Sequence, residues 1–183
     1  MGAAPDSWDA LLTAMTHKGY TKQELISAGL AVNGKNGRLY DKFRNRLMLP
    51  VIDVRGDVVG FGSRVLDKSE PKYMNTPETL TYSKRRILYG MNLAKKSKRS
   101  NIILCEGNLD VVTLHQAGFD NAVASMGTAL TQEQLRLLSR YTKELVLCYD
   151  NDNAGQQATR RALELLNNSE FSVKVLQLSL IHI

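Results

Sequence analysis

The stretch LVLCYDNDNAGQQATRRALELL, residues 145–166, joins a strand pattern to a helix pattern and decides the fold of the second half of the chain. Its first residues form an apolar run with the length of a buried strand, and its last fourteen place apolar side chains at helical spacing. Asp150 and Asp152 lie between the two patterns, and Gly155 lets the loop enter the helix without a Cβ clash. Carboxylates before a helix are usually caps, so this motif alone favours caps over a metal site.

Strand and helix patterns continue to alternate over residues 101–183. Apolar strand patterns cover 101–107, 121–127, 143–150 and 171–178, and helical patterns with short connections cover 109–118, 131–142 and 154–168. This alternation predicts a parallel sheet covered by helices on both faces. Ligands of such sheets bind beyond the carboxyl ends of the strands.

A second strand end also carries acidic residues. Glu106 follows the strand pattern of NIILC, and Asp110 lies about one helical turn further on. Because carboxyl ends of parallel strands meet at one edge, we expect these residues to lie near Asp150 and Asp152. Oxygen ligands without His or Cys favour Mg²⁺ or Mn²⁺. The sequence therefore predicts a divalent-cation site at this edge.

The first half of the chain has a different pattern. Helical spacing is found over residues 7–17 and after the Thr21–Glu24 capping box, and two Asn-Gly pairs indicate turns. Two strands are expected around a turn at 55–57, then a polar loop over 67–79, a short helix around 81–90 and a basic run at 95–99. We expect an α+β lobe over residues 1–100 and a parallel α/β domain over residues 101–183.

Composition limits the function classes. No apolar run reaches the ~20 residues that span a bilayer, and no secretory signal is present, so we expect a cytoplasmic protein. Cys105 and Cys148 lie singly in apolar strands and are expected to be free core thiols, and no Cys/His cluster suggests zinc. The net charge of +6 is uneven: residues 1–100 hold 18 Lys/Arg against 9 Asp/Glu, which suits a polyanion.

The arrangement strand-Glu-Gly, later strand-Asp-x-Asp-x-Ala-Gly-helix, resembles the TOPRIM domain of bacterial primases, topoisomerases and some nucleases. The first half of the chain narrows the resemblance to one class of TOPRIM protein. It is similar to the basic subdomain of DnaG-type primases over the stretches GRLYDKFRNRLMLPVIDVRGDVVGFGSRVLDKSEPKYMNTPET and YSKRRILYGMNLAKK. Two stretches of the second half also resemble primases, EGNLDVVTLHQAGFDNAVASMGTALT and YDNDNAGQQATRRALELL. The resemblance covers nearly all of residues 5–178.

The resemblance implies a primase catalytic core that transfers nucleotides and makes short RNA primers on single-stranded DNA from ribonucleoside triphosphates. Glu106, Asp150 and Asp152, with Asp110 beside them, would bind Mg²⁺ or Mn²⁺, and Glu106 would act as a ligand or as a proton shuttle. Residues expected to meet nucleotide phosphates or template are Arg44, Arg46, Arg64, Lys72, Asn75 and Lys84. The resemblance also implies a replicative helicase as partner, bound through a domain outside this chain, and a location at the nucleoid.

The chain departs from the family pattern in several places. It lacks the zinc-binding domain and the start of the core, and it stops at SLIHI without a downstream Asp-Pro-Asp segment, which puts the activity of this chain alone in question. Asn151 stands where Gly is usual. Two alternatives stay open: another TOPRIM enzyme, such as a topoisomerase, a nuclease or a recombination protein, or a nucleic-acid-binding module without catalysis.

Overall fold

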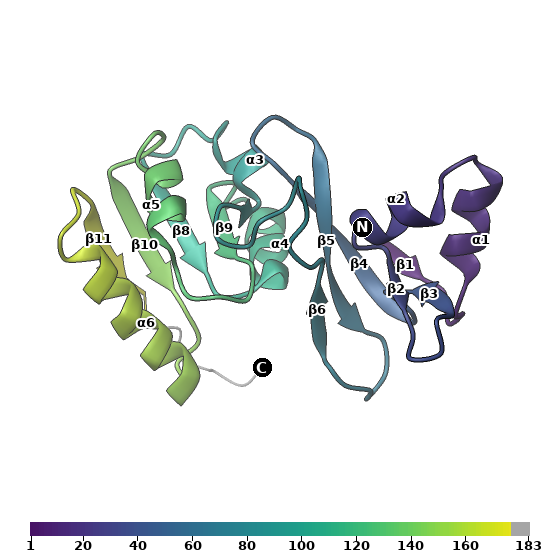
Figure 1. Cartoon of the computed structure of the whole chain (residues 1–183). Coiled ribbons are helices and arrows are strands. Elements are labelled where there is room, and N and C mark those ends of the chain that lie inside the picture. Colours follow the sequence, from purple (N-terminus) through teal and green to yellow (C-terminus); the bar gives the residue numbers. More distant parts are fainter. Residues whose placement is uncertain (177–183) are drawn as a thin grey trace. The chain divides into compact units, whose positions relative to one another are not determined.

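The computed structural model describes residues 1–176 and divides into two compact units (Figure 1). Unit 1 consists of residues 1–51 and 58–83, and unit 2 consists of residues 52–57 and 84 onwards. This spatial division differs from the boundary expected at residue 100, because residues 84–100 pack with the second half. The SLIHI tail and the end of the last predicted strand lie outside the described residues.

Unit 1 is built on an antiparallel sheet and a small hairpin. The sheet has the order β1-β4-β5-β6, and its strands are β1 (Gly2–Ala4), β4 (Arg46–Ile52), β5 (Val58–Val65) and β6 (Tyr73–Asn75). The other elements are α1 (Ala10–His17), α2 (Lys22–Ser27), β2 (Ala31–Asn33) and β3 (Leu39–Asp41). The predicted capping box is confirmed, because Thr21 accepts the Glu24 amide and Glu24 accepts the Thr21 amide. The predicted turn between β4 and β5 is also present, with Gly56 at φ 107°.

Unit 2 is a five-stranded sheet in the order β11-β10-β8-β9-β7. Its strands are β7 (Leu88–Tyr89), β8 (Asn101–Cys105), β9 (Ala122–Ser125), β10 (Glu144–Cys148) and β11 (Ser172–Val175). Its helices are α3 (Met91–Ala94), α4 (Asn108–Gln116), α5 (Gln132–Leu138) and α6 (Asn153–Leu166). All strand pairs are parallel except β7 with β9, so the predicted parallel α/β sheet is confirmed.

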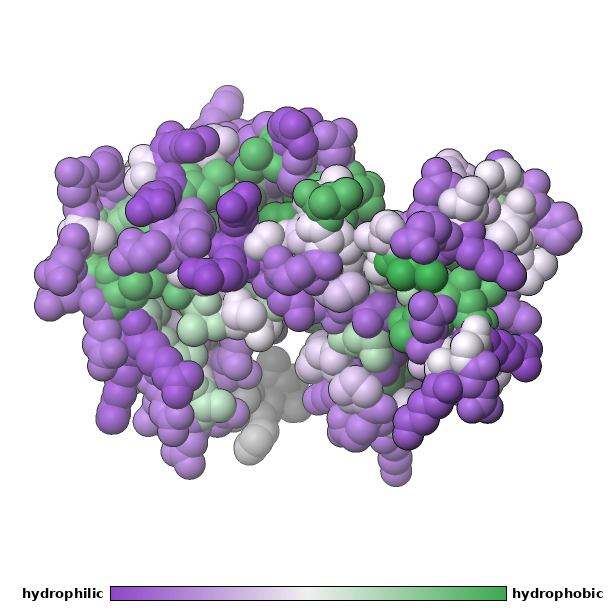
Figure 2. Space-filling model, viewed as in Figure 1, coloured by the Kyte–Doolittle hydropathy of each residue, from purple (hydrophilic) through white to green (hydrophobic). Residues whose placement is uncertain are grey.

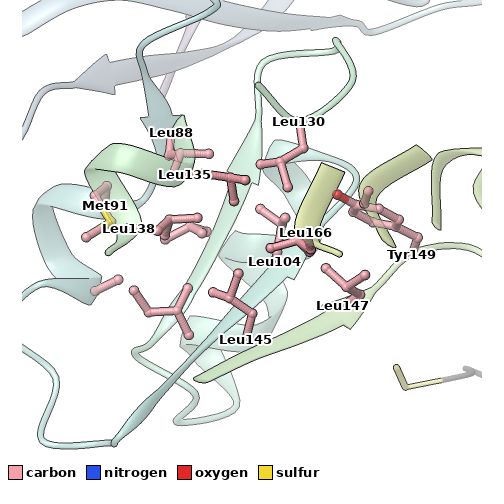
Figure 3. Close-up of a cluster of buried hydrophobic side chains, with 14 residues drawn as sticks. Leu88, Met91, Leu104, Leu130, Leu135, Leu138, Leu145, Leu147, Tyr149 and Leu166 are labelled. Carbon is pink, nitrogen blue, oxygen red and sulfur yellow. The ribbon is translucent and has the colours of Figure 1, made fainter. Parts of the chain in front are cut away.

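Helices cover both faces of this sheet, as the sequence predicts. On one face, buried residues of α3, α5 and α6 pack against alternate strand residues (Figure 3). Leu104 of β8 and Leu147 of β10 are fully buried there. On the other face, Val111 of α4 packs against Cys105 and Cys148. Because side chains alternate along β8 and β10, Leu104 and Leu147 lie on one face of the sheet and Cys105 and Cys148 lie on the other.

The helix predicted around residues 81–90 is wrong. Residues 88–89 form β7, and Gly90 has a φ of 82°, which a right-handed helix does not allow. The buried Gln134 side chain of α5 donates to the carbonyl oxygens of Lys84 and Ile87, at 3.0 and 2.9 Å. These tertiary hydrogen bonds hold the segment in a turn and overrule its weak local helix propensity.

Most of the molecular face in Figure 2 is hydrophilic, with small apolar areas between charged side chains. Within residues 1–176, no helix combines the length and the apolar character needed to cross a membrane.

Candidate active site

The acidic residues of unit 2 follow two neighbouring strands at the point where the strand order reverses. The chain passes from the central β8 to β9 on one side and then to β10 on the other. Cys105, the last residue of β8, pairs directly with Cys148, the last residue of β10. Glu106 follows the first and Asp150 lies two residues after the second, so both emerge at the same edge. Ligands of open α/β sheets bind at such a switch point.

The loop between β10 and α6 is fixed by Asp152 and Gly155. Asp152 is the N-cap of α6, and its Oδ1 accepts the Gly155 amide at 2.8 Å. Gly155 is buried against the Asp150 backbone, and a Cβ there would overlap the Asp150 carbonyl oxygen. The prediction that this loop needs a glycine is therefore confirmed.

Asp110 also has a local structural role. Its carboxylate accepts the Gly107 amide at 2.9 Å at the start of α4. Asp110 and Asp152 therefore both cap a helix at the same edge, and the cap prediction for the motif of Asp150 and Asp152 is confirmed at Asp152. Each remains exposed, so capping leaves carboxylate oxygens open to solvent.

The four carboxylates interact electrostatically. The pKa of Glu106 is raised by partial burial and by the charge of Asp150, with smaller contributions from Asp152 and Asp110. A hydrogen bond from the Asp150 backbone amide opposes this shift. Burial and the charge of Asp150 likewise raise the pKa of Asp110. No lysine or arginine among the described residues contributes to either shift, so the negative charge lacks a protein counter-ion.

Within residues 1–176, no three Asp, Glu, His or Cys side chains converge closely enough to form a ready-made metal cluster. Like charges keep apart when no cation holds them together, and two of the four serve as caps. The donor set itself fits Mg²⁺ or Mn²⁺, because it is all carboxylate, solvent-accessible and without a protein counter-ion. Glu106, Asp150 and Asp152, with Asp110 beside them, are the residues that would hold such an ion.

This charge excess predicts that the contribution of Glu106 to the stability of the metal-free protein falls as pH rises. Because the folded-state pKa of Glu106 lies above its ordinary value of 4.5, the folded protein binds the proton more tightly than the unfolded chain. The contribution of Glu106 therefore declines from about pH 4.5 until the raised pKa is passed. We expect Glu106→Gln to remove this decline in thermal unfolding scans, and Mn²⁺ at pH 7 to raise the melting temperature of the parent.

The control for this prediction is Glu164→Gln, which removes an exposed charge on α6. If the melting temperature of Glu106→Gln changes with pH from 4 to 7 in the same way as that of the parent and of this control, the electrostatic account is contradicted.

Two substitutions at Asp152 separate its capping role from its charge. Asp152→Ala loses the bond to the Gly155 amide and is expected to cost about 1 kcal/mol of unfolding free energy. Asp152→Asn keeps an acceptor oxygen, so its stability is expected to stay near that of the parent. Both variants are expected to bind Mn²⁺ at least about tenfold more weakly. Urea unfolding and calorimetric titration measure the two effects, and equal Mn²⁺ affinity in parent and Asp152→Asn rules out the ligand role.

In unit 1, Arg64 and Lys72 line one hollow of about 500 Å³, a size that suits a nucleotide. Both cations lie 5.7 Å from the exposed Tyr73 ring. The hollow also holds Asp67 and Glu70, but among the described residues neither Arg64 nor Lys72 forms an ion pair. The cations of the hollow are therefore available to an anion.

Arg44 and Arg46, which were expected to meet nucleotide phosphates or template, both contact other parts of unit 1. The Arg44 guanidinium stacks 4.2 Å from the Trp8 ring and donates to the Asp41 carbonyl oxygen. Arg46 is only 5% exposed, and its Nη2 donates to the Pro71 carbonyl oxygen at 2.9 Å. Burial, then the charge of Arg44, lowers the pKa of Arg46. Arg46 thus supports the loop that carries Lys72, rather than presenting its charge to solvent.

Asn75 and Lys84 lie in different units. Asn75 ends β6 and pairs with Gly62 of β5, whereas Lys84 begins the main segment of unit 2. The backbone of Lys84 is held by Gln134, a residue that sequence reasoning missed. The sequence feature that could have drawn attention to Gln134 is its place as the third residue of the helix that begins after Thr131. Nothing in the sequence connects Gln134 to residue 84.

Trp8 is a second residue that sequence reasoning missed. It is 61% exposed, and it lines a hollow of about 460 Å³ with Lys35, Arg38 and Tyr40. An exposed aromatic ring among basic side chains is typical of surfaces on which bases stack. The available signal was the single tryptophan of the chain lying in its basic half.

The fold and the acidic edge define unit 2 as a Toprim-like domain. A family model described as Toprim-like matches residues 103–181, and one described as DNA primase catalytic core, N-terminal domain, matches residues 1–95. The chain belongs to the DNA primase catalytic-core family.

Curated and solved relatives agree with this assignment. The chain is 50% identical to the DNA primase of Clostridium acetobutylicum over 179 residues, which are 97% of this chain and 30% of that protein. It superposes on the Escherichia coli primase catalytic core with a TM-score of 0.89 and 40% identity, covering 99% of this chain and 59% of that one. A DnaG primase catalytic domain bound to single-stranded DNA gives a TM-score of 0.87 at 40% identity, over 97% of this chain and 59% of that one. The chain therefore spans about 30% of the curated relatives and about 60% of these solved domains.

Proposed function

We propose that this chain is the metal-binding part of a primase catalytic core, which joins ribonucleotides into a short RNA primer on single-stranded DNA. One observation carries this proposal: in a chain of the DNA primase family, four carboxylate residues lie at the switch-point edge of a Toprim-like sheet, and the charge of Asp150 helps to raise the pKa values of Glu106 and Asp110. A divalent cation held there supplies charge neutralisation to a phosphoryl group and activates a hydroxyl.

The acidic residues have different roles in this proposal. Asp150 and Asp152 are held by the cap and by the packing of Gly155, so their backbone is positioned before any ligand binds. Glu106 lies next to them, and its raised pKa suits either a metal ligand or a proton acceptor.

The basic hollow of unit 1 supports the nucleic-acid part of the proposal. Arg64 and Lys72 offer two cations beside an aromatic ring, which suits a sugar-phosphate chain with stacked bases. Trp8 offers a second aromatic surface in the same unit. We propose that Arg44, Asn75 and Lys84 contact template or nucleotide, and that Arg46 acts by supporting the loop.

The test of the proposed function is a primer-synthesis assay with Mn²⁺, radiolabelled ribonucleotides and a single-stranded DNA template. The proposal expects short RNA products that require the divalent cation and the template. Nicking or relaxation of supercoiled DNA without RNA synthesis favours the other TOPRIM enzymes. DNA binding without either activity, and without Mn²⁺ binding, favours a non-catalytic module.

Lys72→Ala is expected to weaken binding of single-stranded DNA or nucleotide about tenfold or more, because one charge-assisted phosphate contact contributes roughly 1.5–3 kcal/mol. Fluorescence anisotropy with a labelled oligonucleotide measures this, and the slope of affinity against salt is expected to fall by about one. The exposed Lys72 contributes little to packing, so the melting temperature is expected to stay unchanged. Lys174→Ala on β11 is the matched control, and equal affinity for both variants refutes the assignment.

The remaining parts of the proposal rest on the family alone. A replicative helicase as partner, a cytoplasmic location at the nucleoid and the use of ribonucleoside triphosphates are part of the proposal and follow from the resemblance.

A further inference from the structure

The two cysteines of the chain lie directly opposite each other in the sheet of unit 2. Cys105 ends β8 and Cys148 ends β10, and the two residues are partners in the parallel ladder. Both side chains project to the face covered by α4, where they pack with Val111. Both are free, buried thiols. The sequence holds no other cysteine, so each thiol has one possible partner within the chain.

The separation of these residues is compatible with a covalent bond. Neighbouring strands lie about 4.8 Å apart, and disulfides join Cα atoms that are about 4.4–6.8 Å apart. The Cβ atoms of a disulfide are only about 3.8 Å apart, whereas Cβ atoms of directly paired residues begin about one strand spacing apart. Bond formation therefore has to draw the ends of β8 and β10 together by roughly 1 Å.

We propose that Cys105 and Cys148 form a redox-modification site, at which a peroxide produces an intrachain disulfide that displaces the acidic edge and weakens its binding of divalent cations. The first part concerns the thiols alone. The second part rests on the proposed function, because it needs the cation site of that function.

The chemistry needs one equivalent of peroxide. Cys148 is 7% exposed and Cys105 is fully buried, so peroxide reaches Cys148 first. The Cys148 sulfur attacks one peroxide oxygen, the O–O bond breaks, and a sulfenic acid and one water form. The Cys105 sulfur then attacks the Cys148 sulfur, the S–O bond breaks, and the oxygen leaves as a second water. The two thiols lose two electrons and two protons, and the peroxide is reduced.

The position of the thiols links this modification to the carboxylates. Cys105 is bonded directly to Glu106, and Cys148 lies two residues before Asp150. The strand ends cannot approach without moving the backbone that carries these two side chains. A displacement of about 1 Å in a catalytic arrangement can cost on the order of 10²-fold in rate.

The experiment treats the whole reduced chain with hydrogen peroxide and measures its intact mass and its Mn²⁺ affinity by calorimetric titration. We expect a monomer lighter by about 2 Da, the loss of two hydrogens in one disulfide, with Mn²⁺ affinity lowered at least about tenfold. Dithiothreitol is expected to restore both values. Peroxide-treated Cys105→Ala is expected to react with the sulfenic-acid reagent dimedone at Cys148, and Cys148→Ala is expected not to react. Both variants are expected to keep the parental Mn²⁺ affinity after treatment.

Each other outcome decides against the proposal. An unchanged mass, a disulfide-linked dimer, or Cys148 sulfinic acid without the intrachain disulfide overturns the modification site. An intrachain disulfide with unchanged Mn²⁺ affinity overturns the coupling to the acidic edge. If the reduced chain binds no Mn²⁺, the cation site of the proposed function fails, and the mass measurement still decides the thiol chemistry.

Discussion

Asp150→Asn is expected to abolish primer synthesis, with a loss of at least about 10²-fold, while single-stranded DNA binding stays nearly unchanged. The substitution removes one charged oxygen, which we propose as a cation ligand, from the edge where β8 and β10 end, and charge stabilisation by a bound cation is worth several kcal/mol in the transition state. The Asp150 backbone amide that bonds to Glu106 is retained. Folding is therefore expected to persist, and removing a like charge is expected to raise the melting temperature of the metal-free protein.

The measurements are Mn²⁺-dependent RNA synthesis, Mn²⁺ affinity and oligonucleotide anisotropy on the same preparations. Glu164→Gln removes an equal charge from the exposed side of α6 and serves as the control. Primer synthesis by Asp150→Asn at the rate of the parent and of this control defeats the catalytic assignment.

Gly155→Ala is expected to disturb the site without changing any charge. The added Cβ would overlap the Asp150 carbonyl oxygen and lie 2.7 Å from its carbonyl carbon, so the loop has to move. Overpacking of this kind costs typically 1–3 kcal/mol of unfolding free energy. Because the displaced backbone is that of Asp150, we also expect Mn²⁺ affinity to fall at least about tenfold.

Gly2→Ala is the matched control, because a Cβ at Gly2 meets no atom within 4 Å. Urea unfolding and Mn²⁺ titration of the two variants measure the effect. A Gly155→Ala protein with parental stability and parental Mn²⁺ affinity contradicts the close packing of this loop on Asp150.

The sequence predicted the second unit well because its signals are local and strong. Apolar runs the length of buried strands identified β8 and β10, and the Thr131 cap and the helical spacing after Asp152 placed α5 and α6. Carboxylates directly after two strands of a parallel sheet had to meet at one edge, whichever way the helices packed. These features depend on periodicity and topology, which the sequence carries directly.

The features that the sequence did not predict depend on contacts between distant residues. The turn at 84–87 is held by the Gln134 side chain, which lies about 50 positions away. Arg46 was expected to meet nucleotide phosphates or template, but it is buried and donates to the Pro71 carbonyl oxygen. Trp8 was read as part of a helix pattern, although it lies exposed beside Arg44 and Tyr40. Charge and spacing in a sequence do not distinguish a basic side chain that supports a loop from one that faces a ligand.

The most direct test of the account is the anomalous scattering of Mn²⁺ in a crystal of the chain soaked in a manganese salt. The account predicts an ion at the carboxyl ends of β8 and β10, bound by oxygens of Glu106, Asp150 and Asp152. Manganese bound elsewhere, with none at this edge at saturating concentration, would contradict it.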